Sequence, residues 1–312
     1  MSTIAYLLPG QGAQAVGMGK GFYDRFEESR EIYRRANTRL GYDLMGLCFE
    51  GPPEELTKTE RCQPALFVTS IAAFAAFRTF VPSHRPVGAA GLSLGELTAL
   101  GVAEAFTFAD GLYLVQARAT AMAACAVSHP GTMLAVIGLS EDAIQSICQQ
   151  SGATAANFNA ADQVVLSGKV SAIEDAERLA KAAGAKRAVR LDVAGAFHSP
   201  LMDAAAKEVK KALERVSFTR PRFPVISNVT AQATDDPDEI RRLLVQQIVS
   251  PVRWDASMRW LIQRGATLFV EFPPSRVLTG LLRRIDGTVK GVAVDEPADF
   301  EKIPDLKALQ AS

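Results

Sequence analysis

Residues 87–96 read VGAAGLSLGE, a short apolar run followed by a serine between two glycines. The uncharged run predicts one buried strand that ends at Gly91, and residues 96–100 predict the start of a helix. The pattern around Ser93 is G-x-S-x-G, which is typical of a nucleophile elbow; the alternative is a tight turn with a bystander serine. Gly91 and Gly95 are needed because a strand that turns sharply into a helix brings the backbones beside the serine close together. The sequence therefore predicts a serine hydroxyl raised above a sheet, beside free N–H groups that can hold an oxyanion.

The bulk composition is that of an ordinary globular protein. The chain has 312 residues, 48% of them hydrophobic, which suggests one large or two modest domains with a substantial core. Lys and Arg number 34, as do Asp and Glu, so no overall basic field exists to hold nucleic acid. The four cysteines form no C-x-x-C, which favours reduced thiols over disulfides or a metal site. The apolar runs at 4–8 and 65–77 are too short for a signal peptide or a membrane span, so we expect a cytoplasmic protein without a membrane partner.

A glycine-flanked glutamine follows the first predicted strand, which covers residues 4–8 and ends at Pro9-Gly10-Gln11-Gly12. Gly10 and Gly12 would fit part of a dinucleotide-binding motif. That motif also needs a second strand ending in an acid, whereas residues 22–40 are charged and helical in period. Gln11 is better explained by a backbone held open beside another loop, and the alternative is a plain turn.

Two further polar residues have unusual surroundings. Arg118 lies between Leu114 and Met122 at helical spacing, so its guanidinium lies along an apolar stripe and needs an anionic partner. That partner is either a structural Asp or Glu or a substrate carboxylate. His198 is one of three histidines and lies just before a helix that Ser199 can cap, which makes it the best candidate for a general base.

The sequence pattern changes after Gly131. Residues 133–138, 153–159, 164–168 and 187–193 predict strands, and residues 140–150 and 171–183 predict helices. This β-α-β-β-α-β order is the ferredoxin-like plan. We predict a small domain over residues 129–195, inserted into a large α/β domain made of residues 1–128 and 196–312.

The rest of the large domain is predicted to alternate between helices and strands. Helices are expected at 57–80, with Pro64 in the first turn, and at 200–216, 240–249, 256–264 and up to Ile285. Strands are expected at 224–228 and 267–272. The tail beyond Asp286 shows no evident chemistry.

Five motifs occur in one chain and in a fixed order: Pro9 to Gly12, Gly91 to Glu96, Arg118, Phe197 to Pro200, and Gln247 to Trp254. With them the chain resembles the malonyl-CoA:acyl-carrier-protein transacylases from about Tyr6 to Ile285. The resemblance implies an α/β-hydrolase-like core with a parallel sheet and a ferredoxin-like insertion. It also implies ping-pong transfer of malonyl from malonyl-CoA to the phosphopantetheine thiol of an acyl carrier protein. Fatty-acid synthesis is the expected setting, and a trans-acting acyltransferase of a polyketide synthase is the alternative.

The resemblance assigns roles to the catalytic residues. It makes Ser93 the acylated nucleophile and His198 its base. Gln247 orients the imidazole through its backbone carbonyl, so the arrangement is a dyad without an acid. Gln11 and Leu94 supply backbone N–H groups to the oxyanion hole. No metal and no cofactor beyond the coenzyme A thioester is implied, and we expect a monomer.

The same resemblance assigns substrate contacts. Arg118 pairs with the free malonyl carboxylate, Phe197 narrows the pocket, and Asn159 contacts coenzyme A. Two positions depart from the family's usual pattern. Leu92 stands where histidine is usual, a form found in some stand-alone acyltransferases that serve polyketide synthases, and a proline common after Asn159 is missing.

A serine acyl hydrolase is the competing class of enzyme, with the same elbow and base and with water as acceptor. An acid between Ser93 and His198 in the sequence would support it. None stands out among the available residues, which are Asp110, Asp142, Asp162 and Asp192. A catalytically dead scaffold is disfavoured because Ser93, His198 and Arg118 are all present.

Overall fold

A five-stranded parallel sheet lies at the centre of the computed structural model, which describes residues 3–304 and 306. Strand β1 (Ile4–Leu8) pairs with β2 (Gly88–Gly91) on one side and with β8 (Leu268–Glu271) on the other. The edge strands are β7 (Val225–Ile226) and β9 (Lys290–Ala293), which gives the order β7-β2-β1-β8-β9. The predicted parallel sheet is confirmed, and β9 was missed because it lies in the tail to which no structure was assigned.

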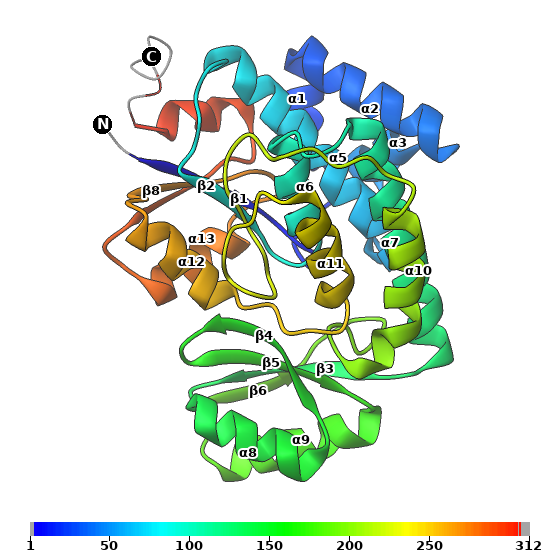
Figure 1. Cartoon of the computed structure of the whole chain (residues 1–312), viewed down its shortest axis with the longest axis vertical. Coiled ribbons are helices and arrows are strands. Elements are labelled where there is room, and N and C mark those ends of the chain that lie inside the picture. Colours follow the sequence, from blue (N-terminus) through cyan, green and yellow to red (C-terminus); the bar gives the residue numbers. More distant parts are fainter. Residues whose placement is uncertain (1–2, 305, 307–312) are drawn as a thin grey trace.

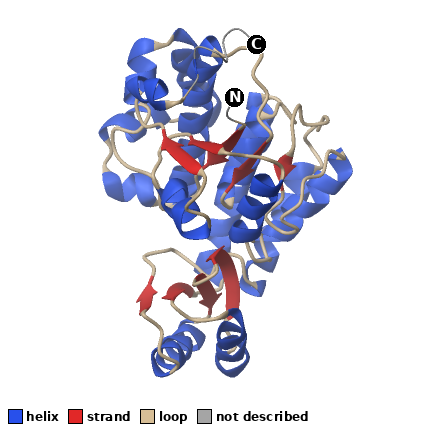
Figure 2. Ribbon diagram, turned by 90° about the vertical axis from the view of Figure 1, so that its left-hand side faces the viewer, coloured by secondary structure: helices blue, strands red, loops and turns tan. Residues whose placement is uncertain are grey.

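Helices cover both faces of this sheet (Figure 1, Figure 2). Side chains of β1 alternate between the faces: Ile4, Tyr6 and Leu8 join one hydrophobic cluster, whereas Ala5 and Leu7 join another. The first cluster is built with α5 (Thr59–Phe80) and α7 (Phe108–Ser128), and the second with α12 (Trp254–Gln263) and α13 (Val277–Ile285). Because both faces are covered, β1, β2 and β8 are buried along their whole length.

The remaining helices of this part are α1 (Lys20–Arg25), α2 (Glu27–Leu40), α3 (Leu44–Glu50), α4 (Pro53–Thr57), α6 (Leu94–Val102), α10 (Asp203–Leu213) and α11 (Pro237–Gln247), with short 3-10 turns at Pro200–Met202 and Pro297–Lys302. Three predictions were wrong in detail. The segment 22–40 is two helices because Phe26 is extended between them. Pro64 lies in the second turn of α5, and the helix expected from residue 200 begins as a 3-10 turn.

A second sheet forms between Thr132 and Arg190 (Figure 2). Its strands β3 (Thr132–Ile137), β4 (Thr154–Ala160), β5 (Gln163–Gly168) and β6 (Arg187–Arg190) are antiparallel and ordered β4-β5-β3-β6. Helices α8 (Glu141–Ser151) and α9 (Val170–Ala182) pack on one face around a separate hydrophobic cluster. This order matches the ferredoxin-like plan, while the domain boundaries at residues 129 and 195 remain our prediction.

The small sheet is joined to the large one through β4. The backbone N–H of Val252 donates to the Ala156 carbonyl at 2.8 Å, and that of Phe158 donates to the Val252 carbonyl at 2.9 Å. The loop after α11 therefore pairs with β4 and holds it beside the carboxyl ends of the central strands. Among the residues that the structure describes, no helix combines the length and the apolar character needed to cross a membrane.

Candidate active site

The strand, turn and helix predicted around Ser93 are all present. Strand β2 ends at Gly91, and α6 begins at Leu94. Between them Ser93 has a φ of 54°, in the sparsely populated region found at functional sites. A Cβ on Gly91 would lie 1.9 Å from the backbone of Gly95, and one on Gly95 would lie 2.1 Å from the Leu8 carbonyl oxygen. The sharp turn that raises the Ser93 hydroxyl thus requires glycine at both flanking positions.

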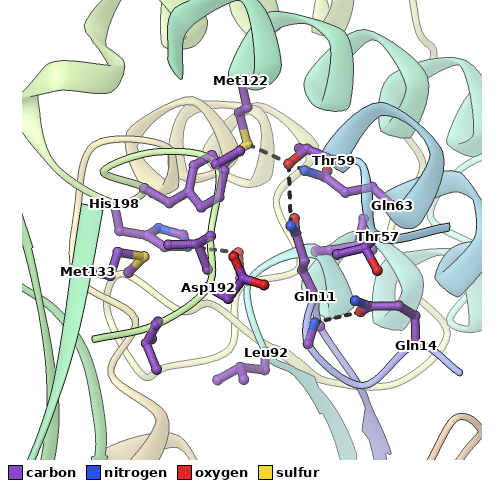
Figure 3. A pocket seen from close by; sticks show the side chains of 18 of the residues that line it. Gln11, Gln14, Thr57, Thr59, Gln63, Leu92, Met122, Met133, Asp192 and His198 are labelled. Carbon is purple, nitrogen blue, oxygen red and sulfur yellow. Dashed lines mark hydrogen bonds between the residues drawn. The ribbon is translucent and has the colours of Figure 1, made fainter. Parts of the chain in front are cut away.

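The loop after β1 passes directly beside this turn. A Cβ on Gly10 would lie 2.4 Å from the Leu92 carbonyl oxygen, so the predicted close approach of two loops is what the structure shows. The backbone N–H groups of Gln11 and Leu94 donate to no other described residue, and both residues line one cavity with Ser93. The Gln11 side chain is held by Thr59, at 3.3 Å between Nε2 and Oγ1 (Figure 3).

His198 lies within hydrogen-bond distance of the serine. Its Nε2 is 2.7 Å from Ser93 Oγ, and its Nδ1 is 2.9 Å from the backbone oxygen of Gln247. A carbonyl oxygen can only accept, so Nδ1 carries the proton and Nε2 accepts the hydrogen bond from the serine hydroxyl. Burial, with a smaller effect from Arg118, lowers the pKa of His198 to about 4. The imidazole is therefore neutral at pH 7 and able to take a proton.

Arg118 reaches the same oxygen from α7. Its Nη2 donates to Ser93 Oγ at 2.9 Å and to Gln247 Oε1 at 3.1 Å, and its Nη1 donates to Gln63 Oε1 at 2.6 Å. The side chain is buried, and burial lowers its pKa to about 10, which leaves it a cation at pH 7. Over residues 3–304 and 306, no carboxylate lies within the 4 Å of an ion pair with Arg118. The guanidinium is held by amide oxygens, so its charge has no direct counter-ion within the described part of the chain.

Three residues around the serine were missed from the sequence: Gln63, Glu96 and Asn228. Asn228 Oδ1 accepts from the backbone N–H of Ser93 at 2.8 Å, and its Nδ2 donates to the Gly91 carbonyl oxygen at 2.8 Å. Signals for all three exist in the sequence. Gln63 is an amide in an apolar helix, Glu96 follows the second elbow glycine, and Asn228 follows a strand whose carboxyl end meets that of β2.

A cavity of about 440 Å³ opens over these groups, a size typical of ligand pockets. Phe197 lines it beside His198, and the small sheet contributes Asn157, Asn159 and Val165. Oδ1 of Asn159 is buried without a hydrogen-bond partner among the described residues. Asp192 is the one residue of the four aspartates considered above that lines the cavity. It is not the acid of a triad, because Nδ1 of His198 is bonded to the Gln247 carbonyl instead.

Comparison with known proteins agrees with this geometry. Residues 5–301 match the family described as acyl transferase domain. The chain belongs to this family. It is 39% identical to the malonyl CoA-acyl carrier protein transacylase of Bacillus subtilis, over 96% of each chain. A solved acyl carrier protein S-malonyltransferase from Vibrio cholerae superposes with a TM-score of 0.93 at 38% identity, over 96% of this chain and 99% of that one. A malonyl-transacylase in complex with its type II polyketide synthase acyl-carrier protein has a TM-score of 0.93 at 35% identity, over all of both chains.

The acyltransferase carries a leucine where histidine is usual before the nucleophile. The half-buried Leu92 side chain packs against the hydrophobic cluster of Ala90, Ile226 and Trp254 and lines the cavity (Figure 3). This position therefore gives the cavity apolar surface in place of a titratable imidazole. Among the described residues, His198 is the histidine that lines the cavity.

Proposed function

We propose that this acyltransferase transfers malonyl from malonyl-CoA to the phosphopantetheine thiol of an acyl carrier protein, through an ester on Ser93. The observation that carries the proposal is the Arg118 cation, which lies 2.9 Å from the nucleophilic oxygen and has no direct counter-ion among the residues that the structure describes. An acyl group on Ser93 that ends in a carboxylate supplies that counter-ion. Arginine cannot shed its charge, and its planar fork matches a carboxylate through two hydrogen bonds.

The first half-reaction forms the ester. His198 Nε2 takes the proton as Ser93 Oγ attacks the thioester carbonyl carbon, and the N–H groups of Gln11 and Leu94 stabilise the oxyanion. The C–S bond then breaks, and the coenzyme A sulfur takes the proton from the imidazolium. The Gln247 carbonyl keeps the ring oriented throughout. In the second half-reaction His198 takes the proton of the carrier thiol as its sulfur attacks the ester carbonyl carbon. The C–O bond to Ser93 then breaks, and Ser93 Oγ takes the proton from the imidazolium.

Two cavity residues are proposed to select the substrate. Phe197 is buried beside the base and leaves little room for a methyl branch on the malonyl α-carbon. Asn159 lines the cavity, and its buried Oδ1 has no hydrogen-bond partner among the described residues. Its side-chain amide is proposed to contact the pantetheine arm.

Transfer is distinguished from hydrolysis by the lifetime of the ester. We expect malonyl-Ser93 to persist in buffer far longer than the time needed for transfer once a carrier is added, since Arg118 fixes the acyl group inside a narrow cavity. Intact-mass measurements after malonyl-CoA, with and without carrier, give both rates. Rapid loss of malonate at a rate unaffected by carrier would favour a serine hydrolase.

The carrier is proposed to dock through basic side chains of the small sheet and of α10, because carriers of this type are acidic. Several of these cations are paired within the chain: Lys181 with Glu177, Arg190 with Glu174 and Glu177, Lys207 with Asp203, and Lys211 with Glu208. Lys186, Arg187 and Lys210 form no ion pair with another described residue, and they are the better candidates.

Salt tests this docking. We expect KM for the carrier to rise several-fold between about 50 and 500 mM NaCl, while acylation by malonyl-CoA changes less, since screening weakens surface charge pairs. Replacing Lys186 and Arg187 with alanine should reduce that salt dependence, and the same change at the paired Lys207 serves as the control. Salt-independent transfer would show that charge does not bring the two proteins together.

We also propose a fatty-acid synthesis carrier as the acceptor, with a polyketide carrier as the alternative. Transfer rates to the two carrier types, measured side by side, decide between them. A cytoplasmic location is proposed in keeping with the four free cysteines. Monomeric action without a cofactor beyond the thioester is proposed from the resemblance alone.

A further inference from the structure

A buried carboxylate lies behind the active site and has no part in the mechanism above. Glu96 is in the first turn of α6, and its side chain is 3% exposed. A single oxygen, Oε2, accepts from the side-chain Nε2 of Gln247 at 2.6 Å and from the backbone N–H of Asn228 at 3.0 Å. A carboxylate is costly to bury, so the contacts that Glu96 makes point to a function.

Gln247 links this carboxylate to the side chains of Arg118 and His198 and to the backbone of Ser93. Its Oε1 accepts from Arg118, its Nε2 also donates to the Ser93 carbonyl oxygen at 3.0 Å, and its backbone oxygen accepts from His198. A carboxylate can only accept and a guanidinium can only donate. Placed between the two, the Gln247 amide has one possible orientation, with its nitrogen toward Glu96 and its oxygen toward Arg118.

Charge supports the same conclusion. The ionisable groups that face Glu96 across Gln247 are Arg118, from α7, and His198, from the turn before α10. Arg118 opposes protonation of His198, and Glu96 is the carboxylate that acts on Arg118 electrostatically. During acylation His198 becomes a cation beside Arg118, and a negative charge one amide away offsets that repulsion.

We propose that Glu96 is a positioning residue that acts through Gln247, fixing the amide that holds Arg118 and His198 and offsetting the charge of Arg118 while His198 carries the Ser93 proton. Glu96 thus supplies the negative charge that the acid supplies in a serine-histidine-acid triad, but it acts through Gln247 and does not contact the histidine directly. This inference rests on the proposed chemistry at Ser93.

The variant Glu96→Gln separates charge from hydrogen bonding. Both N–H groups bond to one oxygen, so the glutamine carbonyl can keep both bonds while the charge is lost. At pH 8 we expect kcat for malonyl transfer to fall roughly tenfold, a difference of about 1.4 kcal/mol in the barrier. KM for malonyl-CoA should not rise, because the variant has lost a negative charge that repels the malonyl carboxylate.

The pH profile of kcat/KM gives the sharper readout. Burial raises the pKa of Glu96 to about 7. As the pH falls through that value, the Glu96 side chain is protonated and becomes uncharged, as the glutamine side chain is in Glu96→Gln. We expect the acid limb of the wild type there, and in Glu96→Gln we expect it displaced to lower pH by more than one unit. At pH values below the wild-type acid limb, kcat/KM of the two enzymes should be the same.

A matched control is available at Glu271, a second buried glutamate, which accepts from the N–H groups of Leu278 at 2.9 Å and Thr279 at 2.8 Å. Glu271→Gln should lower the melting temperature and leave the acid limb in place. If Glu96→Gln does not fold, Glu96→Asp keeps the charge and should keep the wild-type limb at a lower kcat.

Two results would overturn the proposal: wild-type kcat in Glu96→Gln, or an unmoved acid limb accompanied by a raised KM. The proposal would also be overturned if the acid limb stayed in place in Glu96→Gln but was lost in Glu96→Asp. Failure of the proposed function is recognised separately, since wild-type protein would then take no malonyl label.

Discussion

We expect that replacing Ser93 with alanine will abolish covalent labelling by malonyl-CoA while the fold survives. The hydroxyl is the group that His198 Nε2 and Arg118 Nη2 both contact, so its removal leaves no nucleophile between the base and the cation. Alanine has no larger steric requirement than serine at this φ of 54°, and the elbow glycines are unchanged. Intact mass after incubation with malonyl-CoA measures the label, and the melting temperature reports the fold.

Ser29→Ala is the matched control for this change. Ser29 is buried and donates one hydrogen bond, to the Ala72 carbonyl oxygen at 2.8 Å, and it lies outside the cavity. We expect it to label normally. A label that remains on Ser93→Ala, or that maps to another residue, would contradict the whole mechanism.

We expect that replacing Arg118 with alanine will remove the preference for malonyl over acetyl. Malonyl keeps a free carboxylate after acylation, whereas acetyl offers the guanidinium nothing. Breaking a buried charge pair costs roughly 2–5 kcal/mol, which corresponds to about 1.5 to 3.7 powers of ten in rate preference. Malonyl transfer should fall by that factor, while acetyl transfer is kept or increased because Ser93 and His198 remain paired. The measurement is kcat/KM for the two thioesters in wild type and variant.

Arg118→Lys provides a check on geometry for this second prediction. Lysine keeps the charge and loses the planar fork, so it should retain part of the malonyl preference. If Arg118→Ala still prefers malonyl by the wild-type ratio, Arg118 has a structural role, and the specificity comes from other residues.

The elements missed from the sequence share one physical cause. Strand β9 is an edge strand whose first two residues, Lys290 and Gly291, are exposed, so it shows no apolar run of the kind that predicted β1 and β8. The break between α1 and α2 at Phe26 depends on tertiary contacts, because Phe26 packs with Phe80 and Phe300, which are distant in sequence. Local pattern alone cannot report either feature.

The elbow could be predicted from the sequence, because its requirements are steric and involve residues close together in the chain. Gly91, Ser93 and Gly95 lie within five positions, and the clash that excludes a side chain at Gly91 is with Gly95 itself. The buried strand before the turn and the ferredoxin-like element order are likewise written in local pattern. Five motifs in a fixed order then sufficed to indicate the family.

The polar groups that surround Ser93 could not be predicted in this way, because they are brought together by the packing of distant segments. Gln247 is 154 positions from the serine and Asn228 is 135 positions from it, and both arrive because β7 lies beside β2 and α11 follows β7. The same arrangement brings a carboxylate behind Gln247 and leaves Arg118 without a direct counter-ion. Hydrogen-bond partners and burial depend on how several distant segments pack in space. The local sequence pattern does not predict that packing.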